Sequence, residues 1–190
     1  IGTVDVEFGF SCMGYEISGG YGARIAQLDD DPESDTIVFV GDGSYLLLNG
    51  DLYSAVITDK KLIVILLNNG GFAVIDKLQT GKGNASYNNL FVDTPTATRM
   101  APVDFVSHAR SLGADAEKVA DAQAFQSAFA RAQQSANSYV IVMDVDPYDG
   151  WTTEGHAWWE VGTPSVSKRR SVRDGHAETE SGRQQQRRGV

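Results

Sequence analysis

Residues 36–72, TIVFVGDGSYLLLNGDLYSAVITDKKLIVILLNNGGF, decide the fold, because two apolar runs in this stretch each end on a polar tripeptide. The runs TIVFV and LIVILL are continuous and rich in β-branched residues, which is typical of strands that are covered on both faces. The first run ends on GDG at 41–43 and the second on NNG at 68–70. Because residues 44–58 are predicted to be helical, the stretch is interpreted as a strand–helix–strand unit.

The alternation of helices and strands continues on both sides of this unit. Helices are predicted at residues 14–28, 103–112 and 122–136, and further strands at 117–120 and 139–145. Strands that are separated by helices pair in parallel through right-handed crossovers. The sequence therefore predicts an α/β fold, a three-layer sandwich with a mostly parallel sheet and helices on both faces.

Composition and charge suggest one folded domain followed by a tail. The chain has 190 residues, of which 42% are apolar, enough for a single core. We expect this domain to span residues 1–166. Residues 167–190 carry seven Lys and Arg against three Asp and Glu and show no apolar periodicity, so the sequence predicts a disordered basic tail. The rest of the chain is strongly acidic, which disfavours nucleic acid as a partner.

The cysteine content and the apolar runs bear on location. Cys12 is the single cysteine, which excludes an internal disulfide and favours a reducing, cytoplasmic setting. The longest apolar run, LIVILL, has six residues and is too short to span a membrane. Because the sequence starts at Ile1 without a methionine, we expect a piece of a longer polypeptide or a processed chain.

The two polar tripeptides offer the groups of a metal–diphosphate site. Asp42 supplies a carboxylate between two glycines, and Ser44 begins a helix whose free N–H groups suit a phosphate. Asn69 offers a neutral amide oxygen, and Mg²⁺ is the ion that bridges such oxygens to a diphosphate. Each tripeptide taken alone is also a common turn composition, so the prediction rests on their combination.

The spacing of the motifs resembles that of thiamine diphosphate-dependent enzymes. In that family GDG is followed, after two dozen or so residues, by NN, and here 24 residues from Ser44 to Leu67 separate them. The resemblance implies thiamine diphosphate and Mg²⁺ as cofactors, with the metal held by Asp42, Asn69 and the main-chain oxygen of Gly71. The residues that it implies for cofactor binding are Ser11, Met13, Gly41, Asp42, Gly43, Ser44, Asn69, Gly71 and Phe72.

Further segments resemble one hydrolase branch of this family, and this resemblance stops at residue 167. They are GFSCMGYEISGGYGA, VGDGSYL, Leu78-Gln79 and HAWWEVGTPSVS. By this resemblance Met13 holds the cofactor in its bent shape, the Ser11 carbonyl accepts from the aminopyrimidine, and the substrate is a cyclic polyol diketone. Ile75 stands where pyruvate decarboxylases carry a glutamate, which disfavours that branch. His156 is a weak catalytic candidate, because a lone histidine in a loop is more often only solvated.

The family also implies a missing part. Its members activate the cofactor through a glutamate on a separate pyrimidine-binding domain, and nothing in this sequence resembles that domain. We therefore expect such a domain in the same polypeptide or in a partner chain, and a homo-oligomer, either dimer or tetramer. Three alternatives remain: an acetohydroxyacid synthase-like carboligase domain, a non-catalytic thiamine diphosphate-binding module, and a purely structural α/β domain.

Overall fold

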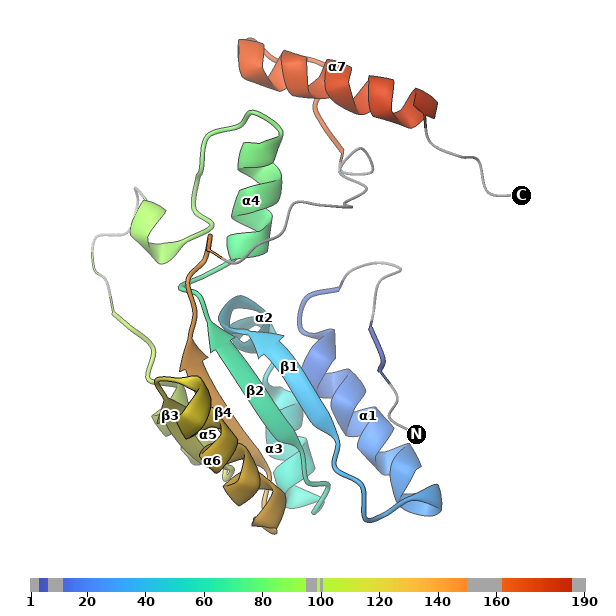
Figure 1. The fold of residues 1–190 in the computed structure, drawn as a ribbon, viewed down its shortest axis with the longest axis vertical. Coiled ribbons are helices and arrows are strands. Elements are labelled where there is room, and N and C mark those ends of the chain that lie inside the picture. The colour runs from blue at the N-terminus through green and yellow to red at the C-terminus, as the bar shows by residue number, and fades with distance from the viewer. Residues whose placement is uncertain (1–3, 7–11, 95–98, 100, 150–161, 186–190) are drawn as a thin grey trace. The chain divides into compact units, whose positions relative to one another are not determined.

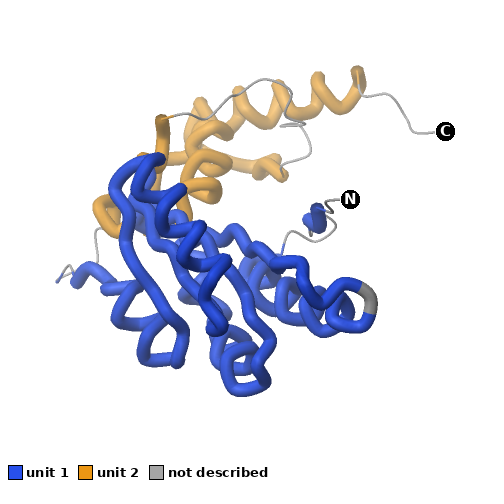
Figure 2. The backbone as a smooth tube through the Cα atoms, turned by 60° about the horizontal axis from the view of Figure 1, so that its bottom comes forward, with its two compact units in different colours: residues 1–71, 99–145 blue, residues 72–98, 146–190 orange. Residues whose placement is uncertain are grey.

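The computed structural model falls into two compact units. It describes residues 4–6, 12–94, 99, 101–149 and 162–185. The first unit comprises residues 1–71 and 99–145, and the second comprises 72–98 and 146–190 (Figure 2). Within the described part of the chain, no helix has the length and apolar character needed to cross a membrane.

The first unit is built on a parallel four-stranded sheet (Figure 1). Its strands are β1 (Ile37–Gly41), β2 (Ile63–Asn68), β3 (Asp115–Val119) and β4 (Tyr139–Asp144). Their order is β1-β2-β4-β3, and every neighbouring pair is parallel. The predicted parallel α/β sheet is therefore confirmed, and the carboxyl ends of all four strands lie along one edge.

Helices cover both faces of the sheet, as predicted. The helices of this unit are α1 (Tyr15–Asp30), α2 (Asp42–Leu47), α3 (Gly50–Ile57), α5 (Phe105–Ser111) and α6 (Ala122–Gln134). One apolar cluster joins α1, α2, α3 and α5 to strand residues such as Val64 and Val140. A second cluster joins α6 to Ile63 and Ile141, which point to the opposite face. The side chains of β2 and β4 thus alternate between two buried layers. The prediction that the run ending in β1 is covered on both faces is wrong, because Ile37 and Phe39 on one face of this edge strand are exposed.

The predicted helix over residues 44–58 is divided into α2 and α3. The break lies at Asn49, whose side-chain amide donates to the Tyr45 carbonyl over 3.0 Å. An asparagine side chain that bonds to the main chain in this way competes with the helical hydrogen bonds. The division keeps α2 short, and its first residue, Asp42, stays at the end of β1.

The second unit contains two helices that the sequence analysis did not predict. They are α4 (Ala73–Gly81) and α7 (Arg170–Gln185), and a 3₁₀ turn at Phe91–Asp93 lies between them in the chain. The prediction of a disordered tail is wrong for residues 170–185, which form α7. The division of the chain between residues 166 and 167 stays a prediction.

Helix α7 is ordered by its packing on the turn that follows α4. Val172 and Thr179 are buried, and the Lys82 ammonium donates to the Thr179 hydroxyl over 3.2 Å. The Ser171 hydroxyl donates to the Gly83 carbonyl over 2.7 Å. Helix α7 itself contributes two buried residues, too few to give the apolar periodicity that a sequence-based prediction needs.

Candidate functional site

The two polar tripeptides meet at the carboxyl edge of the sheet. Gly41 pairs in register with Leu67, so Asp42 and Asn69 follow the ends of neighbouring strands. The Asn69 N–H donates to Asp42 Oδ1 over 3.3 Å. Gly70 and Gly71, with φ of 82° and 145°, turn the chain directly after Asn69. The structure thus brings the predicted metal ligands Asp42 and Asn69 together across 27 residues of sequence.

Two oxygen atoms at this edge are buried and have no hydrogen-bond partner among the residues that the structure describes. They are Oδ2 of Asp42 and Oδ1 of Asn69. Buried polar atoms are nearly always hydrogen-bonded, so two buried oxygens without partners, on residues that contact each other, indicate a ligand. A carboxylate and an amide oxygen are suitable ligands for Mg²⁺, and the donor set therefore fits this ion. Among the described residues, no group of three His, Cys, Asp or Glu side chains is placed to hold a metal ion.

The electrostatics of Asp42 also fit a cation. Its side chain is fully buried, and this burial raises the pKa of the Asp42 carboxyl above its ordinary value. The Asn69 N–H, which donates to Asp42 Oδ1, opposes this rise in the pKa. The charged carboxylate is therefore only partly compensated by the protein, and a bound cation would stabilise it.

Helix α2 is held in place by the side chain of Tyr45. Tyr45 is fully buried, its hydroxyl shares a hydrogen bond of 2.9 Å with His108 Nδ1, and its ring packs edge-on against Phe105. Burial raises the pKa of Tyr45 to about 12. Gly43 and Ser44, the predicted diphosphate residues, are buried in the first turn of this helix. The position of the first turn of α2 is thus fixed by contacts with α5.

Comparison with known proteins identifies the family. Residues 2–143 match the family described as thiamine pyrophosphate enzyme, C-terminal TPP binding domain. The chain belongs to this family. Thiamine pyrophosphate is another name for thiamine diphosphate, so the family agrees with the predicted cofactor.

Curated relatives of this thiamine pyrophosphate-binding domain share one name, 3D-(3,5/4)-trihydroxycyclohexane-1,2-dione hydrolase. The relative from Bacillus cereus strain AH820 is 34% identical over 97% of this chain and 29% of its own length. The one from Bacillus licheniformis is 36% identical over 90% of this chain and 26% of its own length. The chain therefore spans less than a third of these relatives. Because the first match covers 97% of the chain, the similarity extends into residues 167–190, beyond the point where the sequence analysis ended it.

Solved structures resemble the fold of this thiamine pyrophosphate-binding domain. Benzoylformate decarboxylase from Polynucleobacter necessarius superposes with a TM-score of 0.63 at 18% identity, over 72% of this chain and 24% of that chain. The thiamine diphosphate-dependent 4-hydroxybenzoylformate decarboxylase from Rhodococcus jostii RHA1 gives a TM-score of 0.58 at 25% identity, over 70% and 23% of the two chains. The architecture of the binding domain is thus shared with decarboxylases.

A second group of polar side chains continues the same edge of the sheet. The Asn68 side-chain amide donates to Asp144 Oδ1 over 2.8 Å, and Lys118 lies 2.6 Å from Asp144 Oδ2. The Lys118 ammonium, followed by the Asn68 amide, holds the pKa of Asp144 below its ordinary value. Neither Asp144 nor Lys118 was predicted from the sequence as part of the site. The sequence signal for this group is the asparagine doublet Asn68-Asn69, of which only Asn69 was predicted to have a role.

The remaining predicted residues have different positions. Met13 lies two residues before the start of α1, with 37% of its surface exposed, and no described hydrogen bond connects it to the Asp42 group. Gly41 ends β1, whereas Phe72 belongs to the second unit and its N–H donates to the Asn89 carbonyl over 2.7 Å. Ser11 and His156 lie outside the described residues.

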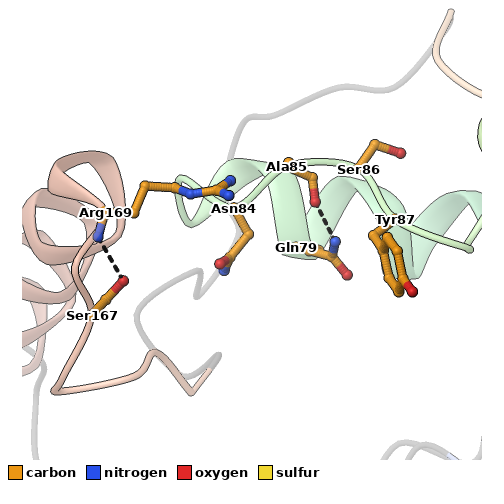
Figure 3. Close-up of a pocket in the computed structure, with 7 residues that line it drawn as sticks. All are labelled: Gln79, Asn84, Ala85, Ser86, Tyr87, Ser167 and Arg169. Atoms are coloured by element: carbon orange, nitrogen blue, oxygen red, sulfur yellow. Dashed lines mark hydrogen bonds between the residues drawn. The ribbon is translucent and has the colours of Figure 1, made fainter.

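The second unit has an open polar cleft of its own (Figure 3). Its volume is about 600 Å³, and its lining consists of Gln79, Asn84, Ala85, Ser86, Tyr87, Ser167 and Arg169. The Gln79 amide donates to the Ala85 carbonyl, and the Arg169 N–H donates to the Ser167 hydroxyl over 3.1 Å. None of the predicted cofactor residues lines this cleft. Geometry and chemistry therefore favour the edge of the sheet, not this cleft, as the candidate cofactor site.

Proposed function

We propose that the chain is the cofactor-binding domain of a thiamine diphosphate-dependent hydrolase. The reaction is the opening of the ring of trihydroxycyclohexane-1,2-dione in myo-inositol breakdown, which makes a cyclic polyol diketone the substrate. The observation that carries the proposal is the pair of unpartnered buried oxygens on Asp42 and Asn69, at the ends of adjacent strands. The names of the curated relatives support the choice of reaction.

In this proposal the residues at the sheet edge hold the metal and the diphosphate. Asp42, Asn69 and the main-chain oxygen of Gly71 are the Mg²⁺ ligands, and Gly43 and Ser44 bind the diphosphate. Ser11, Met13, Gly41 and Phe72 are the further cofactor contacts. When it is bound, thiamine diphosphate supplies a nucleophilic carbon and an electron sink for breaking a C–C bond beside a carbonyl. Burial of Asp42 keeps water from competing for the metal.

Catalysis in this proposal needs a second domain. A glutamate on a pyrimidine-binding domain activates the cofactor, and that domain belongs either to the same polypeptide or to a partner subunit of a cytoplasmic homo-oligomer. The chain spans 29% of the relative from Bacillus cereus AH820, which leaves ample length in such an enzyme for this domain. The cofactor domain of residues 1–166 is therefore expected to bind but not to turn over substrate alone.

The first test is the substitution Asp42→Asn. It keeps the shape of the side chain but removes the charge, so Mg²⁺-dependent binding of thiamine diphosphate should fall by at least tenfold. The thermal midpoint without metal should not fall, because a buried and partly compensated charge has been removed. Titration calorimetry with and without Mg²⁺ measures the first effect, and Asp29→Asn, at an exposed position of α1, is the control.

An unchanged affinity in the Asp42→Asn variant would refute the proposed site. The reaction is tested separately, by adding trihydroxycyclohexane-1,2-dione to the complete enzyme together with its pyrimidine-binding domain. Ring opening supports the hydrolase, whereas carboligation of pyruvate without ring opening would favour the acetohydroxyacid synthase-like alternative. Cofactor binding with neither reaction would favour a non-catalytic module.

A further inference from the structure

The residue before the proposed metal ligand is held more firmly than the ligand itself. The main-chain carbonyl of Asn68 accepts from the Val145 N–H over 2.9 Å. The side-chain amide of Asn68 donates to Asp144 Oδ1 over 2.8 Å. Asn68 and Asp144 also pair in register on β2 and β4. The main chain and the side chain of Asn68 are therefore both attached to the end of β4.

Asn69, in contrast, has little support of its own. Its N–H makes a long hydrogen bond of 3.3 Å to Asp42 Oδ1, and its side-chain oxygen has no partner in the described part of the chain. Gly70, with a φ of 82°, follows it and adds no side chain that could restrict the turn. The conformation of Asn69 is therefore determined largely from one side, by the attachment of Asn68 to β4.

Both oxygens of Asp144 are engaged, so this carboxylate is not itself a free metal ligand. Oδ1 accepts from Asn68, and Oδ2 forms the ion pair with Lys118. The Lys118 and Asp144 side chains are 54% and 58% exposed, and an ion pair with this exposure contributes at most about 1 kcal/mol. The contact that bears on the metal site is therefore the one between Asp144 and Asn68.

We propose that Asp144 is a positioning residue of the metal site, acting through Asn68 to aim the Asn69 side-chain oxygen at the place next to Asp42 Oδ2. This inference rests on the proposed function, since it concerns the same metal. It adds a third strand to the site: Asp42 directly follows β1, Asn69 directly follows β2, and β4 holds the end of β2 in the productive conformation. Groups that orient a metal ligand typically change metal affinity by about 10- to 100-fold when they are removed.

The test measures metal affinity directly, with Mn²⁺ as a paramagnetic probe in the presence of thiamine diphosphate. Asp144→Ala in the full chain should weaken Mn²⁺ binding by about tenfold. Asp144→Asn should restore most of the affinity, because its side-chain carbonyl still accepts from Asn68. Lys118→Ala, which removes only the exposed ion pair, is the matched control and should bind Mn²⁺ with unchanged affinity.

A second variant separates positioning from general destabilisation. Asn68→Ala leaves the Lys118–Asp144 ion pair intact and should weaken Mn²⁺ binding as much as Asp144→Ala does. The double variant should bind no more weakly than either single variant, because both remove one contact. Additive losses would overturn the proposal, as would a loss in Asp144→Ala that Asp144→Asn does not reverse.

Hydrogen exchange provides a readout without metal or cofactor. The Asn69 N–H should exchange faster in Asp144→Ala than in the unaltered chain, while amides in the centre of β2 keep their protection. Equal acceleration throughout β2 would mean that Asp144 only stabilises the sheet, and the positioning role would be wrong. If Asp42→Asn loses metal binding but Asp144→Ala does not, the proposed function stands and the positioning role fails. If neither variant loses metal binding, both fail.

Discussion

The substitution Tyr45→Phe tests whether the buried hydroxyl fixes the helix that carries Asp42. At neutral pH it removes the hydrogen bond of 2.9 Å to His108 Nδ1. The free energy of unfolding should fall by about 1 kcal/mol, the usual net contribution of a buried hydrogen bond. The ring and its edge-on contact with Phe105 remain, so no cavity adds to this cost.

The same variant should behave differently at high pH. Burial raises the pKa of Tyr45 from 10.0 to about 12, so the folded protein keeps the phenol protonated after the unfolded chain has begun to ionise. The contribution of Tyr45 to the free energy of unfolding is therefore fully present below pH 10, the pKa in the unfolded chain, and is lost as the pH rises through the folded pKa of about 12. Two pKa units correspond to about 2.7 kcal/mol. The unaltered protein should lose roughly 1.4 kcal/mol relative to Tyr45→Phe by pH 11, which reverses the order of their stabilities.

Urea unfolding at pH 8, 10 and 11, followed by circular dichroism, measures both effects. Because lysines and other groups titrate in both proteins, the difference between the two free energies of unfolding isolates the effect of Tyr45. Tyr53→Phe is the control, because Tyr53 lies in α3 with 51% of its surface exposed, and its difference should stay near zero at every pH. A difference between Tyr45→Phe and the unaltered protein that remains constant from pH 8 to 11 would refute the reasoning.

Two further predictions concern close packing at glycines. Gly20→Ala should destabilise the first unit by about 1–3 kcal/mol, because the new Cβ would overlap Cγ2 of Val38. Gly22→Ala in the same helix is the control and should not destabilise the unit, because its new Cβ meets nothing within 4 Å. Equal effects of the two substitutions in urea unfolding would contradict the packing. Gly83→Ala should detach α7, because Gly83 has a φ of 81° and the new Cβ would overlap the Ser171 carbonyl. An unchanged helical signal in circular dichroism, together with unchanged resistance to protease, would contradict this prediction.

The elements of the sheet could be predicted from sequence because their signals are local. A continuous β-branched run such as residues 62–67 leaves few alternatives to a buried strand. The predicted helix at 14–28 is confirmed as Tyr15–Asp30, with Ile17 buried. Ile25 shares the face of Ile17 by helical spacing but is 45% exposed, because periodicity predicts a face but not how far the neighbouring elements extend over it.

The parts that could not be predicted depend on contacts between distant residues. Helix α7 has a polar sequence, and its order comes from the turn at Lys82 and Gly83, some 90 residues earlier in the chain. The partner of Asn68 is 76 residues away, and only the register of β2 and β4 places Asp144 beside it. Local pattern contains no information about such pairs.

The candidate site could be predicted only in part, because motif spacing is a local signal and side-chain orientation is not. The choice of Asp42 and Asn69 depended on motif spacing, and the structure adds that one oxygen of each is buried and unpaired. The ligand roles themselves stay predictions, as do the cofactor contact of Ser11 and the catalytic role of His156, which fall on residues outside the described part of the chain. What sequence could not give is the orientation of each side chain, which is set by tertiary contacts.

The parallel register of β1 and β2 has a consequence for how this site can vary in evolution and in engineering. Gly41 stays opposite Leu67 whatever the length of the connection, which enters β2 at Ile63, at the end of the sheet far from Asn69. Insertions or deletions near Asp59, where the chain turns with a φ of 53°, would change the sequence distance between the two motifs but not their separation in space. A search for distant members should therefore allow variable motif spacing, and a designer has at this turn a place to graft a new segment.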